Sequence, residues 1–216
     1  MGRYTHQTGR SMIEMLGVLA IIAVLTIGGI AGYSKALMMY RTDRVLSQIT
    51  HTVARTRVAF ISQKNYAGLG EDEDKIGDVL VNADILPKDT IIRDKEGNAI
   101  IPYRFKNPFK GNISMRIGNK SQKGDKSAFI IHYDYIPKSA CIEIATSAWG
   151  DINGSGFVML SINKPLSNKM NGRNCESTPI SQMESAIHCS HDKIMLNAAA
   201  AHACQDKDNT LELMFY

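Results

Sequence analysis

A run of about twenty residues without a charged side chain, residues 15–34, constrains this chain more than any other feature. At about 1.5 Å of rise per residue, a helix of that length crosses a hydrocarbon core about 30 Å thick. A buried core helix would normally carry a polar stripe, whereas only Thr26 and glycines interrupt this run. A cleaved secretory signal would be shorter and would end in an A-x-A-like site. The run therefore predicts a membrane-spanning helix.

The composition bounds what the rest of the chain can be. With 216 residues, of which 44% are hydrophobic and 21% charged, the chain is long enough for one medium-sized globular domain besides the span. The formal net charge is only +4, and the Lys and Arg residues are interleaved with acidic ones. Because a basic stripe is missing, we expect no specific binding of nucleic acid.

A single acidic residue, Glu14, stands at the beginning of the apolar run. An unpaired carboxylate inside a bilayer costs about 2.5–3.5 kcal/mol, so it is rarely found there without a partner. An interfacial glutamate that reaches back to the head groups is the simplest alternative. An ordinary membrane anchor needs no such residue.

The residues around Glu14 resemble the processing motif of type IV prepilins, because Gly9 precedes the string RSMIEML. The resemblance implies that a prepilin peptidase cuts after Gly9, which makes residues 1–9 a leader, and that Arg10 becomes a methylated first residue. It also implies a salt bridge from Glu14 to the terminal amine of Arg10 in a neighbouring subunit. Such a pair removes two uncompensated charges only when the subunits are in register. Pilins usually begin with an apolar residue, and Arg10 departs from that pattern.

The helix is predicted to continue beyond the span, because no proline occurs before Pro87. Apolar residues recur at spacings of four and seven, at Met38, Val45, Ile49, Val53 and Phe60, and polar residues occupy the other faces, at Arg41, Arg44, Gln48, Arg55 and Arg57. We therefore expect one helix from Ser11 to Lys64, apolar all round in its first half and amphipathic in its second. The pair Gly28 and Gly29 is the expected place for a bend.

The remaining residues, 65–216, are predicted to form a globular α+β head. Runs rich in β-branched and aromatic residues predict strands over residues 90–93, 99–105, 112–117, 128–133, 157–162 and 209–216. Short helices are expected over residues 76–83 and, after Pro137, over residues 138–149. The strands suggest an antiparallel meander, which the last strand closes. The expected fold is that of a type IV pilin: a long N-terminal helix packed on an antiparallel sheet that disulfides fasten.

All four cysteines lie after the span, which favours an oxidising compartment for the head. The order of Leu86-Pro87, residues 107–111 and the cysteines looks like that of type IVb pilins. This resemblance implies a disulfide between Cys141 and Cys204. Cys175 and Cys189 then form a second disulfide, or they bind zinc together with His188 and His191.

Other constellations have simpler interpretations. The acidic residues 71–74 are consecutive, whereas calcium ligands alternate along a loop, so a solvated loop is expected. His132 and Asp134 lack the nucleophile elbow of a hydrolase. The Gly-x-Gly strings at residues 68–70 and 154–156 lack the helix and lysine of a phosphate loop. Apart from the zinc alternative at Cys175 and Cys189, we therefore expect no metal, no cofactor and no enzymatic activity.

The resemblance implies a structural subunit of a type IV pilus, a homo-oligomeric helical filament used for adhesion, conjugation, DNA uptake or motility. The implied partners are the prepilin peptidase, the pilus assembly machinery of the inner membrane, and a receptor on a surface or host. The subunit would span the inner membrane with its head in the periplasm and become extracellular on assembly. A minor pilin acting as tip adhesin or DNA receptor, and a type II secretion pseudopilin, are the alternatives.

Overall fold

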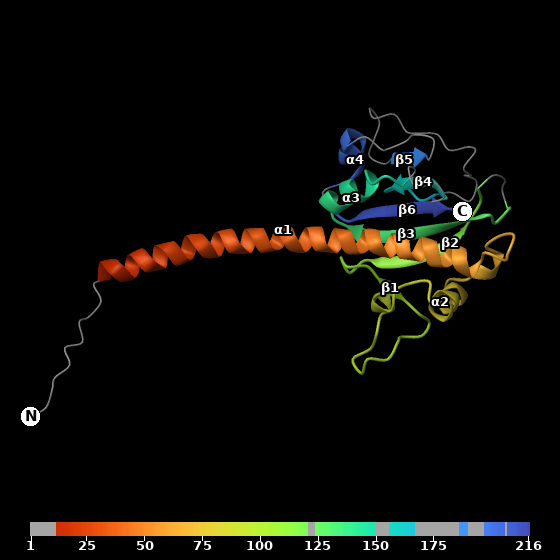
Figure 1. The fold of residues 1–216 in the computed structure, drawn as a ribbon, viewed down its shortest axis with the longest axis horizontal. Helices are drawn as coiled ribbons and strands as arrows, with labels where there is room; N and C mark the ends of the chain where they lie inside the picture. The colour runs from red at the N-terminus through yellow and green to blue at the C-terminus, as the bar shows by residue number, and fades with distance from the viewer. Residues whose placement is uncertain (1–11, 121–123, 150–155, 167–185, 190–196, 206) are drawn as a thin grey trace, which may run out of the picture. The chain divides into compact units, whose positions relative to one another are not determined.

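The computed structural model describes residues 12–120, 124–149, 156–166, 186–189, 197–205 and 207–216 (Figure 1). The chain divides into two compact units, residues 1–40 and residues 41–216. The elements are α1 (Met12–Ala59), α2 (Glu73–Asn82), β1 (Phe105–Lys106), β2 (Asn112–Gly118), β3 (Ala128–Ile136), α3 (Lys138–Ala145), β4 (Phe157–Ile162), β5 (Ala186–Cys189), α4 (Asn197–Ala203) and β6 (Asn209–Phe215), with short 3-10 turns at Ala67–Leu69 and Lys88–Thr90.

The predicted long helix is confirmed, and it runs without interruption through Gly28 and Gly29. It ends at Ala59 and not at Lys64 as expected. Tight turns replace the helix there, since the amide of Gln63 donates to the carbonyl of Phe60 at 2.9 Å. Phe60 is thereby turned into the hydrophobic core, where it is buried.

The second half of α1 buries the expected apolar residues Val45, Ile49 and Val53. The same face also buries polar residues, so the prediction that Gln48 lies on another face is wrong. Thr52 and Thr56 are accommodated because each hydroxyl donates to the carbonyl four residues earlier, at 2.7 Å. The buried side-chain oxygen of Gln48 has no hydrogen-bond partner among the described residues. Simple apolar periodicity therefore understates how wide the buried face is.

The head contains a six-stranded antiparallel sheet with the strand order β1-β2-β3-β6-β4-β5. The α+β class and the antiparallel pairing are confirmed. The topology is not a simple meander, because β6 lies between β3 and β4 in the middle of the sheet (Figure 1). In register, Leu213 of β6 faces Ile131 of β3 on one side and Leu160 of β4 on the other. The last strand therefore joins the two halves of the sheet.

The two faces of the sheet contribute to different hydrophobic clusters. One cluster joins the second half of α1 to α2, α3 and the sheet, through residues such as Ile49, Phe129 and Phe215. The smaller cluster includes Ile130, Met214 and Leu166. Alternate residues of β3 and β6 enter one cluster or the other, as the two-residue period of a strand requires.

Several peripheral elements differ from their predictions. Helix α2 begins at Glu73 instead of residue 76, since acidic residues in a first turn favour a helix N-terminus. The predicted strands over residues 90–93 and 99–105 are reduced to two isolated bridges, Ile91 with Phe105 and Arg93 with Ala99. Pro102 has no amide hydrogen to contribute to a ladder there. Strand β5 and helix α4 were not predicted.

Helix α3 ends at Ala145, four residues before the expected end. The hydroxyls of Thr146 and Ser147 donate to carbonyls of the last turn, and the indole nitrogen of Trp149 donates to the carbonyl of Ile144 at 2.8 Å. These side chains take up acceptors that a continuing helix would have used. The Trp149 ring meets the Phe215 ring edge-on at 6.3 Å, so it packs on the core at the end of the helix.

Candidate assembly surface

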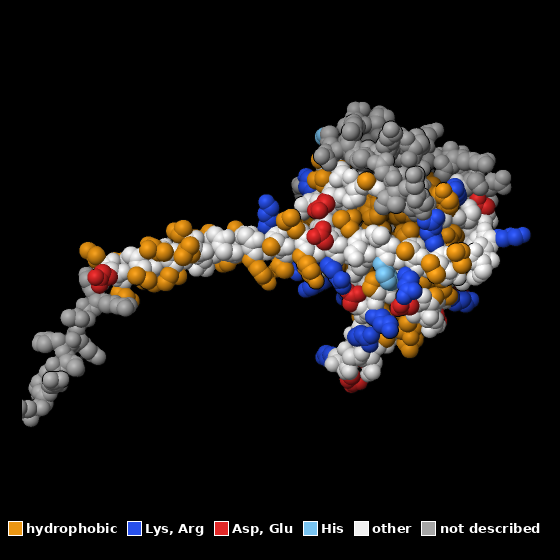
Figure 2. All heavy atoms as spheres, in the orientation of Figure 1, with side chains coloured by type: hydrophobic (Ala, Val, Ile, Leu, Met, Phe, Trp, Pro, Cys, Tyr) orange, Lys and Arg blue, Asp and Glu red, His pale blue; other side chains and the backbone are white. Residues whose placement is uncertain are grey.

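The first half of α1 is an apolar surface that no other described part of the chain covers. Its large hydrophobic side chains, from Met12 to Tyr33, are all exposed, and Figure 2 shows them along the helix. Among the described residues, α1 is the one helix long and apolar enough to cross a membrane, and its apolar stretch is not buried within the structure. Such a surface requires lipid or other protein around it.

The glycines and the hydroxyl of this segment suit an apolar environment. Open space surrounds Gly17, Gly28, Gly29 and Gly32, where a second helix could approach closely. The hydroxyl of Thr26 donates to the carbonyl of Ile22 at 2.7 Å, so this polar group is satisfied within the helix itself.

Glu14 lies in the first turn of α1 and is the only Asp, Glu, Lys or Arg among described residues 12–34. A carboxylate in a first turn is favoured by the partial positive charge of the helix N-terminus. Gly9 and Arg10, the predicted processing site, lie outside the described residues. The proposed pairing of Glu14 with the amine of Arg10 therefore stays a prediction.

The predicted disulfide between Cys141 and Cys204 is present and joins α3 to the end of α4, with the Cα atoms 5.9 Å apart. Both cysteines are buried. The buried amide of Asn209 holds the same segment: its oxygen accepts from the Gln205 amide at 2.6 Å and its nitrogen donates to the carbonyl of Ile136 at 3.0 Å. The sequence analysis did not single out Asn209. A polar residue at the first position of an apolar strand is a pattern that could have indicated a buried hydrogen-bonding role.

The second pair of cysteines, Cys175 and Cys189, lies mostly outside the residues that the structure describes. Cys175 and His191 are not among the described residues, and for Cys189 and His188 only the backbone of β5 is described. The disulfide of Cys175 with Cys189, and the alternative zinc site, stay untested predictions.

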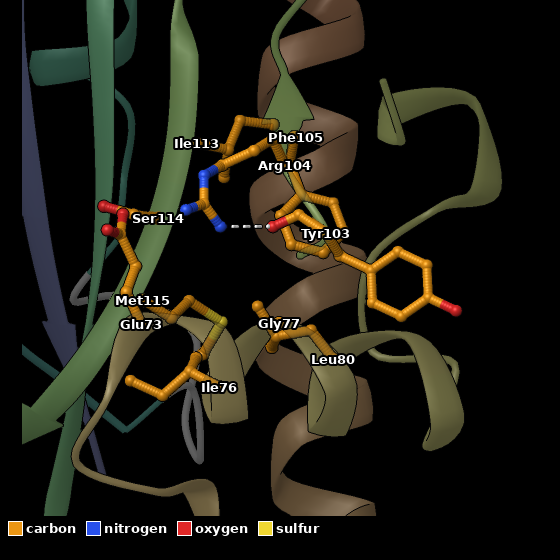
Figure 3. A pocket seen from close by; sticks show the side chains of 10 residues that line it. All are labelled: Glu73, Ile76, Gly77, Leu80, Tyr103, Arg104, Phe105, Ile113, Ser114 and Met115. Carbon is orange, nitrogen blue, oxygen red and sulfur yellow. Dashed lines mark hydrogen bonds between the residues drawn. The ribbon is translucent and has the colours of Figure 1, made fainter. Parts of the chain in front are cut away.

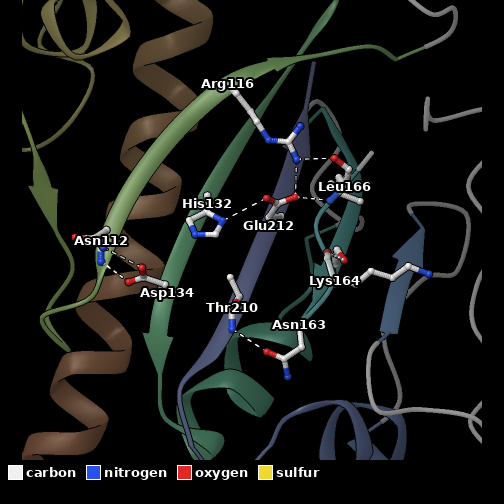
Figure 4. A network of polar contacts seen from close by, with 10 residues as sticks. Asn112, Arg116, His132, Asp134, Asn163, Lys164, Leu166, Thr210 and Glu212 are labelled. Carbon is white, nitrogen blue, oxygen red and sulfur yellow. Dashed lines mark hydrogen bonds and ion pairs between the residues drawn. The ribbon is translucent and has the colours of Figure 1, made fainter. Parts of the chain in front are cut away.

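A carboxylate that the sequence did not single out, Glu212 of β6, organises a polar network on the sheet (Figure 4). One of its oxygens accepts from Arg116 of β2 at 2.7 Å and from the amide of Leu166 at 2.6 Å. The other lies 3.3 Å from the Nδ1 atom of His132. His132 is thus engaged with Glu212, while Asp134 accepts from the amide and the side chain of Asn112. Neither residue is arranged as part of a hydrolytic triad.

The Glu212 network predicts acid sensitivity of the head. Burial raises the pKa of Glu212, but the hydrogen bonds from His132 and Leu166 and the charge of Arg116 outweigh it, so the pKa lies below its ordinary value of 4.5. A lowered pKa contributes stability that is present above the ordinary value and is lost as the pH falls through the folded value. We expect Glu212→Gln to lower the free energy of unfolding by about 1–3 kcal/mol at pH 7. In urea titrations, the difference in free energy of unfolding between the wild type and Glu212→Gln should become smaller below pH 4.5. A difference that stays constant with pH would contradict a stabilising role of the Glu212 carboxylate.

The acidic residues 71–74 are arranged for internal ion pairs. Glu71 pairs with Lys126 at 2.7 Å, Asp72 with Lys75 at 3.0 Å and Asp74 with Arg104 at 3.1 Å. The hydrogen bond and charge of Lys126 lower the pKa of Glu71. The carboxylates thus point to different cations, and among the described residues no group of three ligands suits a metal ion.

A small cavity lies between α2 and β2, beneath the Arg104 side chain (Figure 3). Its volume is about 20 Å³, and it is lined by residues such as Ile76, Gly77 and Met115. Room for about one water molecule excludes an organic ligand at this place.

Comparison with known proteins gives matches over almost the whole chain. The sequence model of the family described as "PilS N terminal" matches residues 39–214. Two relatives are each 23% identical to this chain, with 98% of this chain and 94% of the relative covered. Both are named "major structural subunit of bundle-forming pilus", one from Escherichia coli O111:H- and one from Escherichia coli O127:H6 (strain E2348/69 / EPEC). A solved structure, the type IV b pilin from Salmonella typhi, is 19% identical, with 76% of this chain and 93% of that chain covered and a TM-score of 0.49.

Proposed function

The chain belongs to the PilS N-terminal family, and from this we infer that it is a type IVb-like pilin, the structural subunit of an extracellular pilus. The observation that carries the inference is the exposed apolar half of α1, with its one carboxylate at Glu14. A soluble monomer cannot leave such a surface in water. Lipid covers it before assembly, and the corresponding helices of other copies cover it in the filament.

We place the unassembled subunit in the inner membrane, with its head in the periplasm. The buried disulfide between Cys141 and Cys204 supports this orientation, because such bonds form and persist in an oxidising compartment. After assembly the head lies on the surface of the extracellular filament.

We further propose that the prepilin peptidase cuts after Gly9 and that the new amine of Arg10 pairs with Glu14 of a neighbouring subunit. The motif that supports this is a glycine followed, five residues later, by the single acidic residue of the apolar segment. Desolvating two opposite charges together is tolerable only when their geometry is good, so the pair favours one register between subunits. The assembly machinery of the inner membrane then adds each processed subunit to the fibre.

The test is to replace Gly9 with valine in the full chain. We expect the precursor to accumulate in the inner membrane and sheared fibres to be lost, because a branched side chain obstructs cleavage at the proposed bond. Gly2→Val, the same change elsewhere in the proposed leader, is the matched control and should leave fibres normal.

Mass spectrometry of wild-type subunits from sheared fibres should give an N-terminus at Arg10, with or without a methyl group. An N-terminus beyond Ser34 would show an ordinary signal peptide and overturn the proposal. Processed subunit that stays in the cell envelope and never enters fibres would point instead to a secretion pseudopilin.

A further inference from the structure

The apolar run of α1 lies between two charged residues of opposite sign. Glu14 stands at its beginning, and Lys35 is the next charged residue along the chain. At about 1.5 Å of rise per residue, the two residues are about 31 Å apart along the helix. A hydrocarbon core is about 30 Å thick, so a bilayer that has Glu14 at one boundary has Lys35 at the other.

Two exposed tyrosines flank Lys35 on the same helix. Tyr33 is 65% exposed and Tyr40 is 62% exposed. Tyr40 follows Tyr33 by almost two full turns, so both leave one side of α1, and Lys35 leaves the opposite side. Tyrosine and lysine at the end of an apolar helix are typical of the boundary between hydrocarbon and water. Because the three residues point to both sides of the helix, they fit a layer that surrounds it, such as lipid head groups, better than a partner on one face.

Lys35 has no carboxylate to pair with. It forms no ion pair with a residue that the structure describes. The positions three and four residues away from it on the helix hold Ala, Gly and Met, so α1 itself offers no acid. The next charged residue, Arg41, is a second cation. Farther along α1, by contrast, Arg55 pairs with Asp84 at 2.9 Å. The charge of Lys35 therefore fits an anion from outside the chain.

We propose that Tyr33, Lys35 and Tyr40 form a head-group anchor in the unassembled subunit. The Lys35 ammonium binds the phosphate of an anionic phospholipid in the periplasmic leaflet, and the two phenols lie among the head groups. The apolar stem of a lysine can stay in hydrocarbon while its ammonium reaches the phosphates. The anchor holds the span at one depth and so keeps Glu14 at the opposite boundary. It rests on the proposed function, which places this end of the span at the periplasmic face.

Quenching by brominated lipids tests where the anchor lies. The full chain carrying Tyr33→Trp is reconstituted in nanodiscs of phosphatidylcholine and phosphatidylglycerol, and the signal of Trp149 is subtracted with the unmodified protein. We expect lipids brominated near the head group to quench the new indole more strongly than lipids brominated at the chain ends. Leu25→Trp, in the middle of the apolar run, is the matched control and should show the opposite order.

The same nanodiscs test the charge, with bromine on one lipid class at a time. Adding Lys35→Gln to Tyr33→Trp should lower the preference for phosphatidylglycerol over phosphatidylcholine about fivefold, as expected for one cation at an anionic surface. Lys35→Arg should keep the preference. Lys64→Gln, the same change at an exposed lysine beyond the end of α1, should leave it unchanged.

The outcomes separate the anchor from the proposed function. If neither lipid class quenches the indole introduced at position 25, the apolar run does not lie in the bilayer, and the membrane placement fails together with the anchor. If that indole is quenched but Lys35→Gln leaves the lipid preference unchanged, the anchor alone is overturned. Quenching of the indole at position 33 mainly from the chain ends would also overturn the anchor alone.

Discussion

Replacing Glu14 with alanine is expected to stop fibre assembly while the subunit still inserts in the membrane and its head still folds. Removing a carboxylate from an apolar segment favours insertion by about 2.5–3.5 kcal/mol. Assembly should fail because the terminal ammonium of the neighbour is then buried without a partner, at a cost of about 3–5 kcal/mol for each contact along the fibre. The measurement compares processed subunit in the membrane with subunit in sheared fibres.

Glu14→Asp is the matched control for this experiment, since it keeps the charge and shortens the side chain by one methylene. We expect an intermediate fibre yield from it. Normal yield from Glu14→Ala would show that the carboxylate does not determine the register between subunits. Loss of the alanine variant from the membrane would show that Glu14 acts on insertion or stability instead.

Loss of the disulfide is expected to destabilise the head strongly. The bond closes a loop between residues 63 positions apart. In the chain-entropy model a loop of that length is worth about 4 kcal/mol, and removing such bonds typically costs about 2–5 kcal/mol. The variant Cys141→Ala/Cys204→Ala, in full-length subunit in detergent, should therefore show a urea midpoint well below that of the wild type and a lower abundance in cells.

The single variants Cys141→Ala and Cys204→Ala control for the side chains themselves. Each removes the bond and leaves one buried thiol, so each should lose nearly as much stability as the double variant. The three losses would be non-additive, as expected when two residues act through one bond. A double variant as stable as the wild type would mean that Asn209 and the surrounding hydrogen bonds hold this part of the head alone.

The parts of the fold that local pattern determines were predictable from the sequence. The apolar run and the spacing of Val45, Ile49 and Val53 predict α1 as one continuous helix, because helix periodicity is a property of a single segment, although they do not predict that it ends at Ala59. The disulfide of Cys141 with Cys204 followed from the resemblance to type IVb pilins and not from spacing. The assembly surface was predictable for the same reason as α1, since it consists of one uninterrupted segment.

What the sequence did not reveal depends on contacts between distant segments. Arg116 and Glu212 are 96 residues apart, and nothing local to either residue indicates that they form an ion pair. Gln48 looks like a surface residue by composition, yet it is buried in the structure. The two β-prone runs around Pro102 do meet, at the bridges Ile91 with Phe105 and Arg93 with Ala99, but they form no continuous ladder, and the strand propensity of each run alone does not reveal this.

The central place of β6 has a consequence for the order of synthesis and export. Strands β3 and β4 do not pair with each other, so the sheet remains in two halves until residues 209–215 have taken their place between them. Closure of such distant pairings is slow compared with helix formation. On the proposed function, the apolar half of α1, which is synthesised before the head, is anchored in the membrane while the head is still incomplete. Time-resolved export should therefore pass through a membrane-bound, protease-sensitive intermediate, and the head becomes a finished unit only when its last strand arrives.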